Sequence, residues 1–304
     1  MLLRLLIIEN CYRSLAVRTM RLLQGISVQN TTKCNGRCTI CPHTRVYSSC
    51  EDMSDEVWAK LLEEITSTNF QGYIAFLLQC EPLMDKKILN RIEDVKRINS
   101  KISVWLFTNA SLLSTTMYKN LASSGLDSLT MSLLSATKED YEQITGLSYE
   151  LVLNNIMKTL VQSSKGTMHI AVNASLGAWS ERDNYFKLFN QFTDKLKFNI
   201  RDSRAGFFDN VKSSYDDWCL KCVNTSKCFC EQPSATLPVF ADGAVRLCSS
   251  DWTGESKLGN ILDTPLHEIF HKVSTLQTVE KLKKGQFDYN CCKSCYTELG
   301  LGGL

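Results

Sequence analysis

The sequence predicts an α/β fold built on a parallel sheet. Between residues 26 and 202, six apolar stretches of strand length alternate with stretches of helical pattern. No low-complexity linker interrupts this range, and no internal repeat is visible beyond the strand–helix unit. Strands that alternate with helices form parallel sheets, because each helix returns the chain to the same end of the sheet through a right-handed crossover.

Each strand is expected from a short apolar run bounded by polar residues. The first is the short stretch ISVQNTT, and the second, YIAFLLQ, is continuously apolar, which is typical of a strand covered on both faces. The six expected strands are residues 26–32, 73–79, 102–109, 126–134, 168–176 and 196–202.

Helical stretches separate these strands. The stretch at 53–68 has Ser54 placed to cap its amino end. The expected helices are residues 53–68, 85–98, about 114–123, the helical sequence that runs to about 163, and 180–193. We therefore expect residues 26–205 to form one domain.

Composition and charge exclude several classes of function. The 304 residues contain 34 Lys and Arg against 32 Asp and Glu, so the net charge favours neither nucleic-acid nor membrane binding. The sequence has no run of about 18 apolar residues, which is the length needed to span a membrane. The apolar start MLLRLLII is interrupted by Arg4 and lacks a small-residue cleavage site, so we expect a cytoplasmic protein. Residues 1–25 are expected to form a helical extension packed on the domain, with a membrane-surface helix as the alternative.

Polar side chains concentrate where the expected strands end. Ligands of parallel α/β sheets bind at this edge, so it is the expected active site. The polar groups are Cys34, Cys38 and Cys41 after strand one, Gln79, Cys80 and Glu81 at the end of strand two, Thr108 and Asn109 at the end of strand three, Ser132 on strand four, Asn173 and Ser175 on strand five, and Arg201, Asp202 and Arg204 at the end of strand six.

Three cysteines in the stretch CNGRCTICP predict an iron–sulfur site. Cys34, Cys38 and Cys41 can hold three irons of a [4Fe–4S] cluster and leave the fourth iron open. Zinc is the alternative, but structural zinc normally closes four ligands in paired spacing. His43 as a fourth ligand would crowd the turn at Cys41 and Pro42. With 14 cysteines and no export signal, we interpret the thiols as metal ligands and not as disulfides.

These motifs resemble those of the radical S-adenosylmethionine (SAM) superfamily. CxxxCxxC is the cluster motif of that family, and LLQCEPLMDKKI resembles its Gly-Gly-Glu-Pro segment, with Cys80 in place of a glycine. FTNASLL and MSLLSATKEDYEQITG resemble its segments at the ends of strands three and four. Ile40 stands where an aromatic residue is common. The resemblance implies a partial (βα)6 barrel.

The same resemblance implies the cofactors and their contacts. SAM would chelate the open iron, and its one-electron cleavage would give a 5′-deoxyadenosyl radical that abstracts hydrogen from a substrate. A flavodoxin- or ferredoxin-type donor would supply the electron. The expected SAM-binding residues are Glu81, Thr108, Asn109, Ser132 and Asn173.

The last hundred residues resemble the auxiliary-cluster domains called SPASM and twitch. TLPVFADGAVRLC predicts a hairpin with a tight turn at Asp242 and Gly243. LGNILDTPLHEIFHKV is expected to form a loop followed by a helix over about 264–274. Only nine residues follow Cys295, which makes the shorter twitch form the closer match. Residues 206–304 are therefore expected to form a small C-terminal auxiliary-cluster domain.

The resemblance implies one auxiliary [4Fe–4S] cluster. Four thiolate ligands would leave no iron of this cluster open, which favours electron transfer over direct substrate binding. Its expected ligands are Cys230, Cys248, Cys292 and Cys295. Cys228 could replace Cys230, and a second metal could occupy Cys219, Cys222, Cys228 and Cys291. His267 and His271 share a helix face, for which packing or solvent exposure is preferred over a metal pair.

The function implied by the resemblance is oxidation of a carbinol carbon in a sugar, an aminocyclitol or a related natural product, as in the twitch-bearing dehydrogenase of butirosin biosynthesis. Arg204, in a segment similar to one in such enzymes, is the candidate substrate-gripping residue. A radical epimerase with a cysteine hydrogen donor and a peptide-modifying SPASM maturase are the alternatives. The short segment before strand one lowers the expectation of a maturase. A non-catalytic iron–sulfur or zinc scaffold would not require Glu81, Asn109 and Ser132 where SAM contacts belong.

Overall fold

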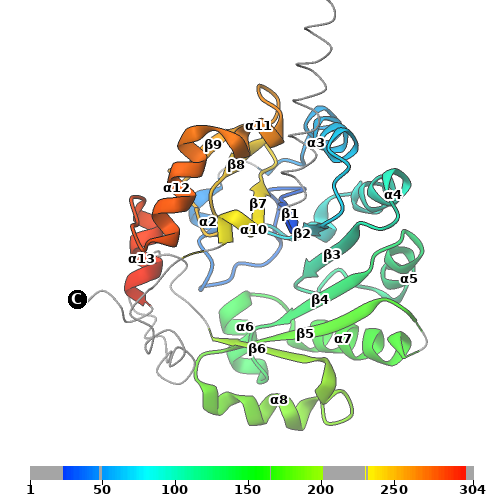
Figure 1. Cartoon of the computed structure of the whole chain (residues 1–304). Helices are drawn as coiled ribbons and strands as arrows, with labels where there is room; N and C mark the ends of the chain where they lie inside the picture. The colour runs from blue at the N-terminus through cyan, green and yellow to red at the C-terminus, as the bar shows by residue number, and fades with distance from the viewer. Residues whose placement is uncertain (1–22, 48–49, 165, 201–229, 231, 299–304) are drawn as a thin grey trace, which may run out of the picture.

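The computed structural model of the chain is built around one nine-stranded sheet (Figure 1). It describes residues 23–47, 50–164, 166–200, 230 and 232–298. The strand order is β6-β5-β4-β3-β2-β1-β7-β8-β9, in which β1 to β6 are parallel neighbours in chain order. This order confirms the predicted parallel α/β architecture.

The six predicted parallel strands are all present, most of them shorter than expected at one or both ends. They are β1 (Gly25–Val28), β2 (Tyr73–Phe76), β3 (Ser103–Thr108), β4 (Ser128–Leu133), β5 (His169–Leu176) and β6 (Leu196–Ile200). The residues that follow β1 to β5 form the rim on which the site is built, because parallel strands end at the same edge.

Helices connect the parallel strands, and most of these helices lie along the outer side of the sheet (Figure 1). They are α2 (His43–Val46), α3 (Asp55–Ser67), α4 (Ile88–Ile98), α5 (Thr115–Ser123), α6 (Lys138–Thr145), α7 (Tyr149–Ser163) and α8 (Arg182–Leu188), with short 3-10 turns η1 (Pro82–Met84), η2 (Trp179–Glu181) and η3 (Thr193–Lys195). The Ser54 hydroxyl accepts a hydrogen bond from the Val57 backbone at the start of α3, as predicted. Among the described residues, no helix has the length and apolarity needed to cross a bilayer.

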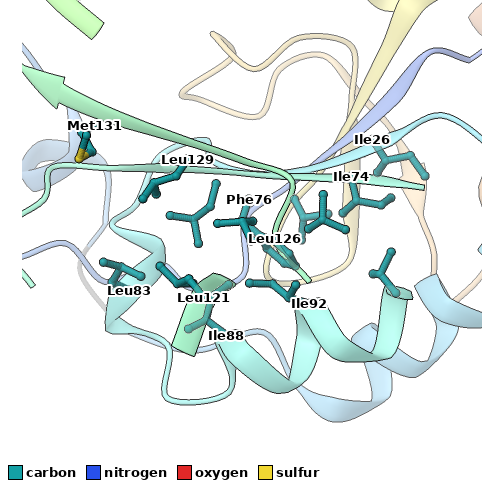
Figure 2. Packing of buried hydrophobic residues seen from close by; sticks show 14 of the residues in the cluster. Ile26, Ile74, Phe76, Leu83, Ile88, Ile92, Leu121, Leu126, Leu129 and Met131 are labelled. Atoms are coloured by element: carbon teal, nitrogen blue, oxygen red, sulfur yellow. The ribbon is translucent and has the colours of Figure 1, made fainter. Parts of the chain in front are cut away.

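The core lies between the outer face of the sheet and these helices (Figure 2). Strands β3 and β4 alternate between fully buried and half-buried residues, which directs one face to the helices and the other to the barrel interior. Ile74 and Phe76 of β2 pack in the same cluster as Ile88 and Ile92 of α4. This packing fixes where each strand ends and therefore where the rim residues lie.

Aromatic side chains fill the barrel interior near the start of the strands. The rings of Tyr73 and Trp105 stack with centroids 4.0 Å apart, and the Tyr73 hydroxyl hydrogen-bonds the Thr236 hydroxyl at 2.8 Å. Gly25 gives room for this stack, since a Cβ there would lie 2.2 Å from the Tyr73 ring.

The predicted C-terminal hairpin is present and continues the same sheet. Strand β7 (Thr236–Val239) pairs in parallel with β1, and β8 (Ala244–Arg246) returns antiparallel to β7. Gly243 adopts a φ of +80° in the turn between them. A short helix, α10 (Gln232–Ala235), precedes β7. The residues that surround Cys248 are thus attached directly to β1 through the sheet.

Two expectations for the segment after the hairpin are wrong. The predicted loop at LGNI holds strand β9 (Lys257–Asn260), which pairs antiparallel with β8. The single helix expected over 264–274 is two helices, α11 (Leu266–His271) and α12 (Val273–Lys283), which meet at Lys272. Lys272 takes an extended ψ of 135°, which no α-helix continues. The chain then forms α13 (Asn290–Glu298), which carries the last three cysteines.

Candidate radical SAM active site

The three-cysteine loop follows β1 on the rim of the barrel. Cys34, Cys38 and Cys41 are all half-buried, and no disulfide joins the described cysteines. Backbone hydrogen bonds tie the loop to the end of α6, from Arg37 to the Thr145 carbonyl at 2.9 Å and from Thr39 to the Ile144 carbonyl at 2.7 Å. The loop therefore has a fixed position relative to strands β4 and β5.

The chemistry of these thiols fits a cationic cluster. Burial raises the pKa of Cys34, and together with the opposing Gly36 backbone N–H and the nearby negative charges of Glu81, Cys38 and Cys41 it brings this pKa to about 12. Thiolates so placed ionise together only when a metal neutralises them. A Cβ at Gly36 would lie 3.4 Å from Cys38 Sγ, so glycine leaves this space open. Soft thiolate donors suit iron–sulfur ligation.

Glu81 is a buried carboxylate at the end of β2. Its Oε1 accepts hydrogen bonds from the Thr108 hydroxyl at 2.7 Å and the Leu83 N–H at 3.1 Å, and its Oε2 accepts one from the Asn109 N–H at 2.7 Å. Burial raises the pKa of Glu81 to about 7, although these hydrogen bonds oppose the shift. A buried carboxylate with this pKa gains an ion pair if an ammonium group binds beside it, as the amino group of SAM would.

Asn109 connects the cysteine loop to the end of β3. Its Nδ2 donates to Asn35 Oδ1 at 2.9 Å, and its Oδ1 accepts from the Ser111 hydroxyl at 2.6 Å and the Ser111 N–H at 2.9 Å. Asn35 Nδ2 in turn donates to Ser111 Oγ at 2.8 Å. The sequence singled out Asn109 as a cofactor contact, but it did not identify Asn35 and Ser111 as its partners.

Ser132 and Asn173 lie side by side on β4 and β5. They are partners in the parallel register, and both are half-buried on the face turned to the barrel interior. Thr130, two residues before Ser132, shares this face and is also half-buried. The wall made by β4 and β5 is therefore polar at the end nearest the rim.

A buried ion pair supports the turn that follows Glu81. Asp85 Oδ2 accepts hydrogen bonds from Arg91 Nε at 2.8 Å and Asn30 Nδ2 at 3.1 Å, and all three side chains are buried. Arg91 also donates to the Met53 carbonyl at 2.6 Å. Sequence reasoning missed this network, although an arginine on the apolar face of a helix beside Ile88 and Ile92 is a usable signal.

The second thiol group lies around the loop after β8. Val245 and Leu247 are fully buried, while Arg246 and Cys248 are half-buried. Burial raises the pKa of Cys248, and the neighbouring Cys230 and Cys291 thiolates raise it further. Cys230, Cys248 and Cys291 are thus neighbours, which fits a shared iron–sulfur site by the same donor argument.

Helix α13 places the remaining thiols next to this group. Cys291 and Cys292 interact through their side chains, and the Cys291 N–H donates to Glu255 Oε1 at 2.6 Å. Cys292 and Cys295 are three residues apart on α13 and therefore share a face. The ligand set Cys230, Cys248, Cys292 and Cys295 remains a prediction, and the structure adds Cys291 as a competing ligand.

Several candidate residues lie elsewhere. Arg201, Asp202 and Arg204, the boundary at 205, Cys219, Cys222, Cys228 and the expected N-terminal helix up to residue 22 lie outside the described residues. His43 Nε2 hydrogen-bonds the Thr32 carbonyl at 2.7 Å, and His267 Nδ1 contacts Glu64 Oε2 at 2.8 Å, joining α11 to α3. The packing role preferred for His267 is consistent with this contact.

Two sequence models of protein families match the chain. The model described as the radical SAM superfamily matches residues 28–169, which hold the three-cysteine loop, Glu81, Asn109 and Ser132. Residues 28–169 therefore form a radical SAM domain. A second model, SPASM, described as an iron–sulfur cluster-binding domain, matches residues 228–296.

Similar proteins include other radical SAM enzymes. The chain is 23% identical over 237 residues to the S-adenosyl-L-methionine-dependent 2-deoxy-scyllo-inosamine dehydrogenase of Niallia circulans, covering 68% of this chain and 95% of that protein. The crystal structure of BtrN in complex with AdoMet and 2-DOIA is 19% identical, with a TM-score of 0.61 over 89% of this chain and 92% of that one. That of anSMEcpe with bound AdoMet and Kp18Cys peptide is 18% identical, with a TM-score of 0.62 over 91% and 96%.

The radical SAM and SPASM matches confirm the predicted family, fold and cofactors. The cofactors are SAM, a [4Fe–4S] cluster and auxiliary iron–sulfur clusters in the SPASM region. The three-cysteine loop and the thiols around Cys248 are the two described places whose donor chemistry fits these clusters. Which residues ligate each cluster and which contact SAM remain predictions from the sequence.

Proposed function

We propose that this radical SAM enzyme oxidises a carbinol carbon of a sugar, an aminocyclitol or a related hydroxylated natural product. The observation that carries the proposal is the direct attachment of the Cys248 loop to the rim of the SAM site. Gln79, two residues before Glu81, donates through its Nε2 to the Ser249 and Asp251 carbonyls, each at 3.2 Å. An electron acceptor held at Cys248 would therefore share a wall with the site of hydrogen abstraction. The dehydrogenase of Niallia circulans supports the same reaction type.

In this proposal the residues of the chain bind SAM and the substrate and orient them. The bound cluster and SAM supply a 5′-deoxyadenosyl radical, with the first electron from a flavodoxin- or ferredoxin-type donor. Glu81 would hold the SAM amino group, while Thr108 and Asn109 fix the Glu81 carboxylate. Ser132 and Asn173 would bind SAM hydroxyl groups from the polar wall of β4 and β5.

The oxidation itself removes two hydrogens from the substrate. One leaves the carbinol carbon as a hydrogen atom and becomes part of 5′-deoxyadenosine. The hydroxyl proton passes to solvent or a base, and the remaining electron passes to the auxiliary cluster, which leaves a carbonyl product. Arg204 is the proposed substrate-gripping residue, because its guanidinium is a permanent donor to hydroxyl or carboxylate oxygens.

Epimerisation is the second candidate, and Cys80 is the observation in its favour. Cys80 neighbours both Glu81 and Cys34, and burial raises its pKa well above the usual value for a thiol. It would therefore carry the S–H bond that a hydrogen-atom donor needs. A peptide substrate is the third candidate, since anSMEcpe is a fold neighbour with a bound peptide.

Anaerobic turnover of the reconstituted enzyme tests these candidates. The enzyme is incubated with SAM, a reductant and, in separate reactions, 2-deoxy-scyllo-inosamine, other aminocyclitols, sugars and a cysteine-containing peptide. We expect one hydroxylated small molecule to stimulate 5′-deoxyadenosine formation and to lose two mass units. A product of unchanged mass in H2O that incorporates deuterium from D2O would indicate epimerisation instead of oxidation. Stimulation by the peptide alone would indicate a peptide substrate.

A further inference from the structure

A continuous chain of hydrogen bonds crosses the rim between the three-cysteine loop and the Cys248 loop. Tyr47 follows α2, directly beyond the three-cysteine loop, and its hydroxyl accepts a hydrogen bond from Gln29 Nε2 at 2.9 Å and donates one to Gln79 Oε1. Gln79 Nε2 then donates to the carbonyls of Ser249 and Asp251. At the other end, Gln29 Oε1 accepts from the Ala241 N–H at 3.2 Å, in the turn between β7 and β8.

Each hydrogen bond in this series has only one possible direction from donor to acceptor. A glutamine oxygen only accepts and its nitrogen only donates, so the Tyr47 hydroxyl must accept from Gln29 and donate to Gln79. Gln29 and Gln79 are 1% and 2% exposed, respectively, which leaves water little access as a replacement partner. Loss of the Tyr47 hydroxyl would leave a buried Gln29 donor and a buried Gln79 acceptor without a partner.

Gln79 joins the Cys248 loop to the barrel, and Glu255 joins it to α13 by accepting hydrogen bonds from the Asn290 side chain and the Cys291 N–H. Further hydrogen bonds lie within the loop. The Asp251 carboxylate, which is fully buried, accepts from the Gly254 N–H at 2.8 Å and from the Ser256 N–H and hydroxyl at 2.9 Å and 2.7 Å. Arg246 donates to the Asp251 carbonyl at 2.8 Å. These contacts shape the loop, whereas Gln79 joins it to the barrel.

We propose that Tyr47 is a positioning residue that fixes the Cys248 loop against the rim of the radical SAM site. Through Gln29 it also holds the β7–β8 turn, so one hydroxyl aligns both ends of the segment 241–251, which contains Cys248. The hydrogen bonds of Gln29, Tyr47 and Gln79 involve the polypeptide alone and need no bound cofactor. Its consequence for an auxiliary cluster rests on the proposed role of Cys248 as a ligand.

The first test uses the apoprotein and does not depend on the proposed reaction. Tyr47→Phe removes only the hydroxyl, and Gln29→Met removes its donor while keeping the shape of the side chain. Tyr118→Phe is the matched control, because Tyr118 is also a largely buried tyrosine and no hydrogen bond of its hydroxyl is described. In hydrogen exchange read by mass spectrometry, we expect the 247–256 peptide to exchange about tenfold faster in Tyr47→Phe and Gln29→Met. The β4 peptide and the Tyr118→Phe protein should match the parent protein.

The second readout is the midpoint potential of the auxiliary cluster in the reconstituted protein, followed by electron paramagnetic resonance. A displaced loop changes the hydrogen bonding and solvent exposure of the thiolates, so Tyr47→Phe should shift this potential while Tyr118→Phe does not. Unchanged exchange of the 247–256 peptide, or equal acceleration in the β4 peptide, would overturn the inference. A displaced loop with an unchanged potential would overturn only the link to the cluster.

Discussion

The carboxylate of Glu81 is held in place at a cost in free energy that ligand binding can offset. Three protein donors surround it, yet burial raises its pKa to about 7. The folded apoprotein therefore favours the protonated form of Glu81 more than the unfolded chain does. A bound ammonium group would reverse this preference, since an adjacent positive charge stabilises the carboxylate.

The sign of the resulting pH dependence follows from this shift. Because the folded-state pKa of about 7 lies above the ordinary value of 4.5, the contribution of Glu81 to stability is complete below pH about 4.5 and is lost as pH rises through about 7. This rise in pH should cost the parent apoprotein ~3 kcal/mol of unfolding free energy, whereas the Glu81→Gln apoprotein should not lose it. Urea unfolding of both proteins between pH 4.5 and 8 measures the difference.

The same substitution should weaken SAM binding about tenfold or more while iron at the three-cysteine loop is retained, since Glu81 would contact SAM and not iron. Equilibrium dialysis and iron analysis measure the two quantities. Parallel unfolding curves for the two proteins across pH, together with equal SAM affinity, would remove Glu81 from the site.

Residue roles could be predicted from the sequence only where a local motif carried them. The cysteines, Glu81 and Asn109 stand in short recognisable segments. The partners of Asn109 were not predictable, because Asn35 and Ser111 reach it from separate loops that only the folded sheet brings together. The same reason explains why the Gln29–Tyr47–Gln79 chain left no pattern in the sequence.

At the scale of elements, the six parallel strands were predictable because each is a dense apolar run between helices. Strand β9 was not, since Gly259 and flanking polar residues give its segment little strand character. The glycine has a packing reason: a Cβ there would lie 3.0 Å from the Ile269 side chain of α11. The break between α11 and α12 is accompanied by a tertiary contact, in which the Thr275 hydroxyl donates to the Ile269 carbonyl at 2.8 Å.

The turn between β7 and β8 gives a prediction about stability. Gly243 has a φ of +80°, and a Cβ there would lie 2.7 Å from Asn260 Oδ1, which belongs to β9. Gly243→Ala should therefore destabilise the protein by ~1–3 kcal/mol, through backbone strain and displacement of Asn260. Chemical denaturation of the apoprotein measures this change.

Gly166→Ala is the matched control, because its nearest neighbour would be 3.7 Å away and its φ is not positive. Equal stability of the Gly243→Ala and Gly166→Ala proteins would show that the turn does not require glycine.

At the scale of the whole molecule, one sheet carries both thiol groups. The sequence predicted an auxiliary-cluster domain after the barrel, but not that β7 would pair with β1 and so extend the barrel sheet. Pairing between strands more than 200 residues apart in the chain leaves no local pattern. It matters for function because it places the Cys248 loop on the same rim as Glu81, joined through Gln79.

The central claim is that an auxiliary cluster, which the thiols around Cys248 would hold, accepts the second electron of a two-electron oxidation. It is tested most directly by the ratio of oxidised product to 5′-deoxyadenosine in Cys248→Ala protein, measured anaerobically with the substrate identified by turnover. Cys50→Ala, which changes an exposed cysteine outside both thiol groups, is the control, and the Cys34, Cys38 and Cys41 triple alanine variant sets the background.

We expect Cys248→Ala to lose about four irons per chain and still form 5′-deoxyadenosine, while its ratio of oxidised product to 5′-deoxyadenosine falls at least ~10-fold below that of Cys50→Ala. A Cys248→Ala protein that lost this iron and kept the ratio of the control would contradict the account.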